Sequence, residues 1–352
     1  MADEAALLTD LLEAYSPTGD EAAGVRAFVR VAARLGFAVE TDAAGNGIAR
    51  CGRGRPQIVY LGHIDTVPGR IPVRREGSRI LGRGACDAKG PLLSALLARP
   101  EALPHGELVV VASVGEESDS RGATHLIPSL APEAVIAGEP SGWNGIAIGY
   151  KGDLRLRARI RGERRHLSSP DPSTTERAMD WAHAVRGLSD TGVDRFHSLT
   201  VKVDAIRSGE SAGRESVEVV VDLRIPPGRT VASVAASLPP LTAADSIETI
   251  ASIEPFESGR SDPVVRALVD GIRAQGGRPT LWRKGGTSDL NIVAPAWGLG
   301  GAAYGPGDAH LDHTDEEALD LADLDKSAEV LRVAFRQLLE GLTPRGSGSG
   351  GG

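Results

Sequence analysis

The stretch QIVYLGHID, residues 57–65, joins a short apolar run to a histidine and an aspartate. A run of about four to eight apolar residues bounded by turn signals is typical of a strand buried on both faces of a sheet. Two similar runs follow at Glu107–Val114 and Ala134–Gly138, and helix-like stretches such as Pro91–Ala98 lie between them. Because strands alternate with helices, the sequence predicts an α/β sheet covered by helices on both faces.

The pattern changes after Lys151. In Leu154–Arg161 apolar residues alternate with arginines, which indicates a strand with one buried and one solvated face. The next segments have the patterns of a helix, two strands, a helix and a strand, at residues 175–188, 198–206, 216–225, 230–238 and 246–253. This βαββαβ order is that of a ferredoxin-like unit. Helical spacing resumes from Asp262, so we expect the smaller domain to be inserted into the larger one.

The expected domains are residues 1–150 and 259–344 for the larger one and 151–258 for the inserted one, followed by a flexible glycine- and serine-rich tail at 345–352. A length of 352 residues agrees with two domains, since about 150 residues per domain is usual. The net charge of −8 argues against nucleic acid as the main partner. No run approaches the roughly 20 apolar residues that span a bilayer. We therefore expect a soluble, cytoplasmic protein without a membrane partner.

Acidic residues and histidines follow each of the three apolar runs. His63 and Asp65 follow the first run, Glu116 and Glu117 the second, and Glu139 the third. The carboxyl ends of parallel strands share one edge of a sheet, and ligands bind at that edge. These side chains are therefore expected to lie in one crevice.

Two glycine-rich segments add Asp87, within Gly82–Gly90, and His313, within Gly305–Thr314. Clustered carboxylates repel each other unless a cation neutralises them, and imidazoles with carboxylates suit zinc. A carboxylate shared by two cations at ~3.5 to 4 Å lets them hold a hydroxide and polarise a carbonyl group. The sequence thus favours a site for two divalent metal ions.

At this point five motifs resemble, in the same order, those of one enzyme family. They are HIDTVP at 63–68, GRG with DAKG at 82–90, GEE at 115–117, GEP at 138–140 and LDHT at 311–314. The family comprises the dinuclear zinc deacylases and peptidases grouped as ArgE, DapE, aminoacylase-1 and carboxypeptidase G. The resemblance covers nearly the whole chain. It implies a zinc-peptidase-like catalytic domain with a mixed sheet flanked by helices, and an inserted lid that also forms a homodimer.

The resemblance also implies roles for individual residues and two divalent ions, Zn(II) or Co(II), per subunit. Asp87 would bridge the two ions, His63 and Glu139 would complete one site, and Glu117 and His313 would complete the other. Asp65 resembles the carboxylate that orients His63. Glu116 resembles the general base that takes a proton from the attacking water and returns it to the leaving amine.

In the inserted domain, Gly162–Pro170 resembles the family segment whose histidine stabilises the oxyanion, across the dimer interface in dimeric members. His166 would then be catalytic. Asp222–Arg224 resembles the segment that supplies an arginine for a substrate carboxylate, which implies substrate binding by Arg224. Gly285–Asp289 resembles the glycine-rich substrate loop, so Gly286 and Thr287 are further candidates.

Within the family, Gly138–Ile146 and Gly149–Gly152 most resemble the hydrolases that release lysine or ornithine from the acidic amino-group carrier protein LysW, in lysine or arginine biosynthesis. The expected reaction is hydrolysis of a linear amide rather than typical endopeptidase cleavage. Acetylornithine deacetylase or succinyl-diaminopimelate desuccinylase is the alternative. A more remote one is a metal- or ligand-binding protein that keeps the fold but has no activity.

The segment Gly209–Gly213 fits the G-x-S-x-G motif of serine hydrolases, with Asp289 and His313 following in hydrolase order. However, it joins two strand-like runs, whereas a nucleophile elbow connects a strand to a helix. We therefore do not expect a serine nucleophile.

Four arginines share one face of the expected strand at 154–161, namely Arg155, Arg157, Arg159 and Arg161. They are either a solvated sheet face or a docking patch for an acidic carrier protein. The second interpretation predicts that reversing Arg157 and Arg159 to Glu raises the KM for a carrier-linked substrate and spares small amides.

Overall fold

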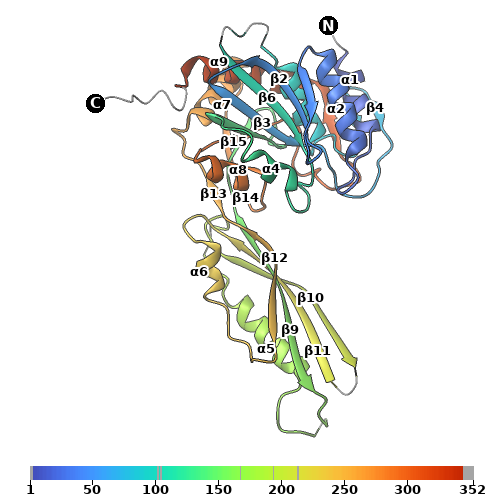
Figure 1. Ribbon diagram of the computed structural model, residues 1–352, viewed down its shortest axis with the longest axis vertical. Coiled ribbons are helices and arrows are strands. Elements are labelled where there is room, and N and C mark those ends of the chain that lie inside the picture. Colours follow the sequence, from blue (N-terminus) through green and yellow to red (C-terminus); the bar gives the residue numbers. More distant parts are fainter. Residues whose placement is uncertain are drawn as a thin grey trace, which may run out of the picture. The chain divides into compact units, whose positions relative to one another are not determined.

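The computed structural model describes residues 3–100, 103, 105–166, 168–192, 194–211 and 214–343. The chain divides into two compact units (Figure 1). The first unit comprises Met1–Ile148, Ser258–Trp282 and Ser288–Gly352, and the inserted unit comprises Gly149–Glu257 and Arg283–Thr287. The expected tail at 345–352 lies outside the described residues. No helix in the described part of the chain is both long and apolar enough to cross a membrane.

A nine-stranded mixed sheet contains the three buried strands that the sequence predicts, and its mixed character agrees with the family resemblance. Its order is β1-β2-β6-β3-β7-β15-β8-β13, and β14 also pairs with β8. The strands are β1 (Ala38–Thr41), β2 (Gly47–Arg53), β3 (Gln57–His63), β6 (Gly106–Ser113), β7 (Ala134–Gly138), β8 (Gly145–Tyr150), β13 (Phe256–Glu257), β14 (Thr280–Lys284) and β15 (Ala302–Ala303). The central strand β3 runs parallel to both β6 and β7. This pairing places the carboxyl ends of the three predicted strands at one edge.

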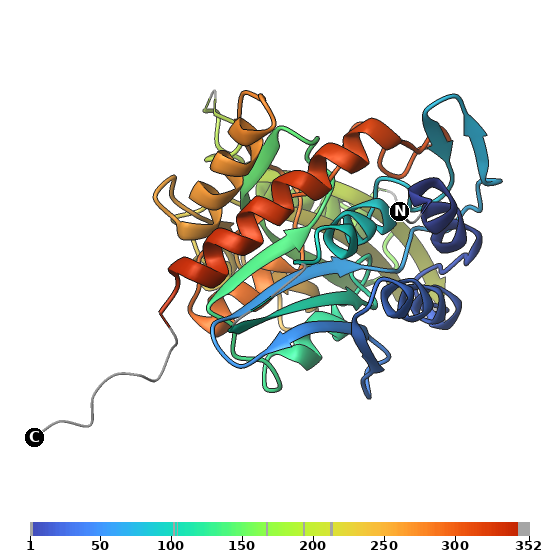
Figure 2. The ribbon, with the colours of Figure 1, turned by 90° about the horizontal axis from the view of Figure 1, so that it is seen from above.

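Helices cover the sheet because its central strands are apolar on both faces. They are α1 (Glu4–Glu13), α2 (Ala22–Arg34), α3 (Lys89–Leu97), α4 (Arg121–Leu126), α7 (Pro263–Ala274), α8 (Leu290–Trp297) and α9 (Leu321–Gly341). Ile58 and Tyr60 of β3 belong to the core cluster formed with α1, α2, α3, α7 and α9. Val59 and Leu61 are equally buried but lie outside that cluster, as alternation along a strand requires. Figure 2 shows α9 crossing one face, with α4 on the other.

A small second sheet in the first unit joins segments far apart in the sequence. Its order is β16-β5-β4, formed by β4 (Arg74–Glu76), β5 (Arg79–Leu81) and β16 (Ala318–Asp320). The segments just beyond this sheet carry Asp87 and His313. The pairing of β5 with β16 therefore brings two predicted ligand segments together.

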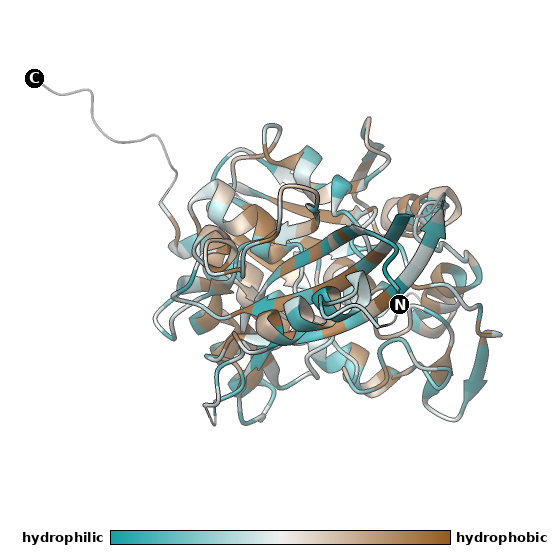
Figure 3. Ribbon diagram, turned by 90° about the horizontal axis from the view of Figure 1, so that it is seen from below, coloured by the Kyte–Doolittle hydropathy of each residue, from teal (hydrophilic) through white to brown (hydrophobic). Residues whose placement is uncertain are grey.

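The inserted unit has the predicted βαββαβ order. Its elements are β9 (Gly152–Glu163), α5 (Thr174–Arg186), β10 (Thr200–Ser211), β11 (Arg214–Ile225), α6 (Val231–Ala235) and β12 (Ser246–Ile253). The sheet order is β10-β11-β9-β12, and every pair is antiparallel. Buried and exposed residues alternate along β9, and hydrophobic and hydrophilic residues are interleaved along the strands in Figure 3.

The G-x-S-x-G segment belongs to the hairpin of β10 and β11. Gly209 pairs with Ser216, and Glu210 pairs with Glu215. Residues 212 and 213 lie outside the described residues. The segment thus joins two strands, as the sequence predicts, and not a strand and a helix.

Candidate metal centre

The carboxyl-end edge of the large sheet positions the first candidate ligands. His63 is the last residue of β3 and is level with Ser113, the last residue of β6. Gly62 is level with Gly138, the last residue of β7, so Glu139 begins the segment beyond the same edge. Asp87 precedes α3, and His313 lies in the segment between β15 and β16. Five elements distant in the sequence therefore contribute to one place.

Two groups of ligand atoms form there and share one carboxylate. His63, Asp87 and Glu139 make one group, and Asp87, Glu117 and His313 make the other, each with its ligand atoms within 4.8 Å of one another. The His63 Nε2 atom lies 2.9 Å from Asp87 Oδ1, and the His313 Nε2 atom lies 3.1 Å from Asp87 Oδ2. Each oxygen of Asp87 thus faces a different imidazole, which is the arrangement of a carboxylate that bridges two cations.

The hydrogen bonds of His63 test whether this site fits a metal ion. Its Nδ1 atom donates to the carbonyl oxygen of Asp65 at 2.8 Å, so in the neutral ring Nε2 carries a lone pair. That lone pair faces Asp87 Oδ1 inside the protein, where His63 is 1% exposed. Two facing lone pairs attract only when a proton or a cation lies between them. Imidazole and carboxylate donors held by a second hydrogen bond are typical of zinc sites, so the residues fit the metal.

The charges of the site shift its pKa values in a consistent direction. Burial alone lowers the pKa of His63, but the facing Asp87 carboxylate outweighs it and raises that pKa well above its usual value. Hydrogen bonds to Asp87 and Glu117 raise the pKa of His313 to about 10. Burial opposes ionisation of Asp87, yet the two imidazoles hold its pKa below the usual range. The site therefore attracts positive charge strongly.

His313 is held in an uncommon backbone conformation. Its φ of 62° lies in the left-handed region, which is rare for residues with a Cβ atom. The following residue stabilises the turn, because the backbone N–H and the hydroxyl of Thr314 both donate to the carbonyl oxygen of Leu311. His313 Nε2 also lies 3.0 Å from Glu117 Oε1. Strain of this kind clusters at functional sites.

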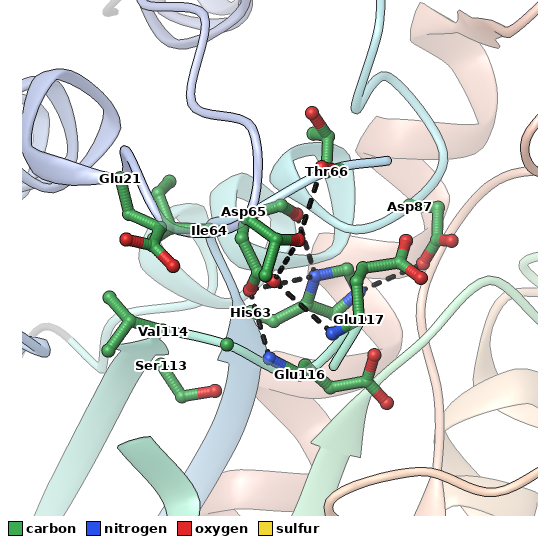
Figure 4. A network of polar contacts seen from close by, with 12 residues as sticks. Glu21, His63, Ile64, Asp65, Thr66, Asp87, Ser113, Val114, Glu116 and Glu117 are labelled. Carbon is green, nitrogen blue, oxygen red and sulfur yellow. Dashed lines mark hydrogen bonds and ion pairs between the residues drawn. The ribbon is translucent and has the colours of Figure 1, made fainter. Parts of the chain in front are cut away.

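Asp65 fixes the turn that carries Glu116 and Glu117 (Figure 4). Its Oδ1 and Oδ2 atoms accept the backbone N–H groups of these two residues, each at 3.2 Å. Thr18 also donates its hydroxyl to Oδ2 at 2.9 Å. The Asp65 carboxylate is 3.7 Å from His63 Nδ1, so the hydrogen bond that orients the ring goes to the Asp65 carbonyl instead.

Glu116 belongs to neither ligand group. Burial raises its pKa well above the ordinary value, His63 partly offsets that rise, and Glu139 and Asp289 add to it. Asp289, which the sequence places at the end of the glycine-rich loop and in the rejected serine triad, accepts a hydrogen bond from Ser113 at 2.7 Å. The Oδ1 atom of Asp289 is buried and has no hydrogen-bond partner among the described residues. The environment of Glu116 is thus acidic.

Comparison with known proteins now decides the family. Residues 59–337 match the model of peptidase family M20/M25/M40. The chain belongs to this family. Members of the M20 family are metal-dependent, in agreement with the two ligand groups.

Two relatives in sequence and one solved structure illustrate the similarity. A putative LysW-lysine/LysW-ornithine hydrolase of Pyrococcus horikoshii is 38% identical, over 95% of this chain and 97% of its own. A LysW-lysine hydrolase of Deinococcus radiodurans is 35% identical, over 95% of this chain and 97% of its own. The crystal structure of aminopeptidase PepT from Bacillus cereus has a TM-score of 0.76 at 21% identity, over 96% of this chain and 99% of that one, which shows the shared fold.

The remaining candidates of this M20 chain lie in the inserted unit. His166 is exposed, and its Nδ1 atom lies 2.7 Å from the Ser168 hydroxyl. Arg224 already forms a bidentate pair, because its Nε and Nη2 atoms donate to Asp222 at 2.8 and 3.0 Å. The sequence analysis missed this partner, although residues two apart on a strand share a face. Gly286 and Thr287 follow β14, and the space around Gly286 is open.

The arginines of β9 are matched by acidic residues from neighbouring strands. Arg155 donates to Asp204, and Arg157 contacts both Glu218 and Glu248. Arg159 also contacts Glu218, at 3.6 Å. Arg161 instead donates to Ala244 and Ser246. This pairing favours the solvated-face interpretation over the docking patch.

Proposed function

We propose that this chain is a dinuclear amidohydrolase that releases lysine, ornithine or both from the carrier protein LysW, in lysine or arginine biosynthesis. The relatives that carry this activity in their names support the proposal, because they are 35 and 38% identical over 95% of the chain. The convergence of all five expected ligand positions on one shared carboxylate is the structural observation that carries it. A protein that binds LysW without hydrolysing its amide would not need these five metal ligands.

In the proposal, His63 and Glu139 would hold one ion, Glu117 and His313 would hold the other, and Asp87 would contribute to both. The ions are Zn(II) or Co(II), which suit mixed imidazole and carboxylate donors. When bound, such a pair polarises the amide carbonyl and lowers the pKa of water. The protein contributes the rigid edge of the sheet and the hydrogen bonds of Asp65, which keep the donors in place.

Glu116 moves the proton in this mechanism. It accepts a proton from the attacking water and delivers it to the nitrogen of the leaving amine. A carboxyl group suits both steps when its pKa lies closer to neutrality than that of an exposed glutamate. The raised pKa of Glu116 supports this role.

The inserted unit completes the proposal as a lid and dimerisation domain of a homodimer. We assign His166 to the oxyanion, Arg224 to a substrate carboxylate, and Gly286 and Thr287 to the substrate loop. A substrate carboxylate at Arg224 would have to share the guanidinium with Asp222. Asp222 thereby keeps the fork oriented before substrate arrives.

The test offers the zinc-loaded protein LysW-linked lysine, LysW-linked ornithine, acetylornithine and succinyl-diaminopimelate in parallel. We expect the kcat/KM for a LysW-linked substrate to exceed the kcat/KM for acetylornithine and for succinyl-diaminopimelate by at least about tenfold. A preference for acetylornithine or succinyl-diaminopimelate would contradict the carrier-protein assignment. Zinc binding without turnover of any substrate would indicate a non-catalytic binding protein.

A further inference from the structure

Glu317 is a buried carboxylate with no ligand or catalytic role in the proposed mechanism. It is 1% exposed and lies immediately before β16. One of its oxygens, Oε1, accepts the backbone N–H groups of Cys86 at 3.0 Å and Asp87 at 3.1 Å. Glu317 thus fixes the backbone of the bridging carboxylate without touching the side chain of Asp87.

Arg83 extends this contact to the segment of His313. It is 4% exposed, and its Nη1 atom donates to Glu317 Oε2 at 3.1 Å and to the carbonyl oxygen of Thr314 at 2.9 Å. Its Nε atom donates to the carbonyl oxygen of Gly69 at 2.9 Å. The buried ion pair of Arg83 and Glu317 therefore connects the backbone of Asp87 with that of Thr314, the residue after His313.

Further bonds surround the pair and make it rigid. The backbone N–H of Gly82 donates to the carbonyl oxygen of Glu317, and the Cys86 thiol donates to that of Ala318 at 2.9 Å. Both oxygens of Glu317 have donors, so the desolvation cost of the buried charge is offset by hydrogen bonds. Removing one partner leaves the other uncompensated.

We propose that Glu317 and Arg83 are positioning residues that set the distance between Asp87 and His313, and so the affinity of the second cation group. The inference rests on the proposed metal site. It implies that changes at Glu317 and Arg83 affect the cation affinities of the two ligand groups to different extents. The Asp65 carbonyl holds His63 without help from Arg83 or Glu317. His313, in contrast, lies in a strained turn, and Arg83 donates a hydrogen bond to the next residue of that turn, Thr314.

The first test is Glu317→Gln, which keeps the shape but replaces one acceptor with an amide donor. Metal-free, full-length protein is titrated with Zn²⁺ against a chromophoric chelator, and His313→Ala identifies the binding step that belongs to the second group. We expect that step to weaken by about 10- to 100-fold in Glu317→Gln, as for other residues that orient metal ligands. The step assigned to His63 and Glu139 should weaken less than this, because His63 is held by the Asp65 carbonyl and only the shared Asp87 is affected.

Glu316→Gln is the matched control, because it removes the same charge one residue away. Glu316 is exposed, and its side chain makes no hydrogen bond or ion pair among the described residues. Both affinities should stay within about twofold of the wild type, since only weak, screened interactions are lost. Arg83→Lys keeps the positive charge but loses the several N–H donors of the guanidinium group, so it should selectively weaken cation binding by the second group. This variant replaces Glu317→Gln in the test if Glu317→Gln does not fold.

Two results would overturn the inference. The first is an equal loss at both steps, and the second is unchanged affinities with a lower melting temperature of the metal-free protein, which would make the pair purely structural. The wild type provides the separate check on the proposed function. If it binds fewer than two Zn²⁺ ions, the dinuclear proposal fails before the variants are compared.

Discussion

The metal centre and the arginine face of the inserted unit both gather charged side chains, but they balance the charges in opposite ways. On the arginine face, Arg157 contacts Glu218 and Glu248, and these partly exposed groups neutralise one another. At the metal centre, Asp87 and two further carboxylates meet only two imidazoles, and the ligands range from the buried His63 to the exposed His313. The difference teaches that carboxylates in excess around one shared ligand suit a cation, whereas exposed charges that are already matched do not require one.

Glu116→Gln should have the largest effect on activity. If Glu116 transfers the proton, kcat should fall by about 10²- to 10⁴-fold, because a positioned acid–base group contributes that much. Zinc stoichiometry should stay at the wild-type value, since Glu116 belongs to neither ligand group. Steady-state kinetics and metal analysis of the same sample provide the measurement. A variant that loses zinc as well as activity would instead place Glu116 among the ligands.

Removing the metal should have the next largest effect, on stability. Without cations the carboxylates at Asp87, Glu117 and Glu139 repel one another, and a bound ion stabilises only the folded chain. At free zinc of about 100 to 1,000 times its dissociation constant, the gain is about 3 to 4 kcal/mol. Calorimetry with and without a chelator measures the shift in melting temperature. The His63→Ala protein should show a smaller shift, and an equal one would argue against His63 as a ligand.

Asp245→Asn should lower stability by about 1 to 3 kcal/mol, the usual cost of leaving buried donors without an acceptor. The Asp245 side chain is 1% exposed and accepts hydrogen bonds from Thr242, Arg161 and Arg177. Burial opposes its ionisation, but these bonds hold its pKa below the ordinary value. The Asp245 carboxylate is thus buried, but unlike the carboxylates of the metal centre it is matched by a cation, Arg177.

The lowered pKa fixes the pH dependence of this effect. Because the folded pKa lies below the unfolded one, the stabilisation is present above about pH 4 and is lost as the pH falls through the folded value. Urea unfolding of the wild type and Asp245→Asn should therefore differ at pH 7 and converge in acid. Asp180→Asn, at an exposed residue of α5 whose side chain has no hydrogen bond among the described residues, is the control. A difference that persists at pH 2 would argue against the ionised form as the source.

The sequence predicts the centre well where ligands follow strand ends. His63 and Glu139 can be predicted because buried strands are recognisable and parallel strands share an edge. The side-chain partners of Asp65 could not be predicted. That residue was expected to orient His63 through its carboxylate, but the carboxylate binds the N–H groups of Glu116 and Glu117. The conformation of the turn after β6 decides which donors lie within hydrogen-bond distance of the Asp65 carboxylate, and the sequence does not specify that conformation.

The burial of a polar residue within an acidic run also could not be predicted from the sequence. Glu317 ends the run Asp315–Glu317, which has the composition of a solvated surface, and yet it is 1% exposed. The partners of the β9 arginines come from β10, β11 and β12, and a strand pattern does not specify the register between strands. Alternation along one strand therefore predicts which face the arginines share, but not what neutralises them.

The double variant Arg157→Glu with Arg159→Glu should have the smallest effect. Exposed ion pairs contribute about 0.2 to 1 kcal/mol each, so replacing attraction to Glu218 with repulsion should lower the melting temperature only slightly. Because acidic residues already balance these arginines, the ratio of kcat/KM for LysW-linked and small amides should stay within about twofold of the wild type. A KM that rises only for the LysW-linked substrate, and more strongly at low salt, would show that the face attracts the carrier despite its internal pairing.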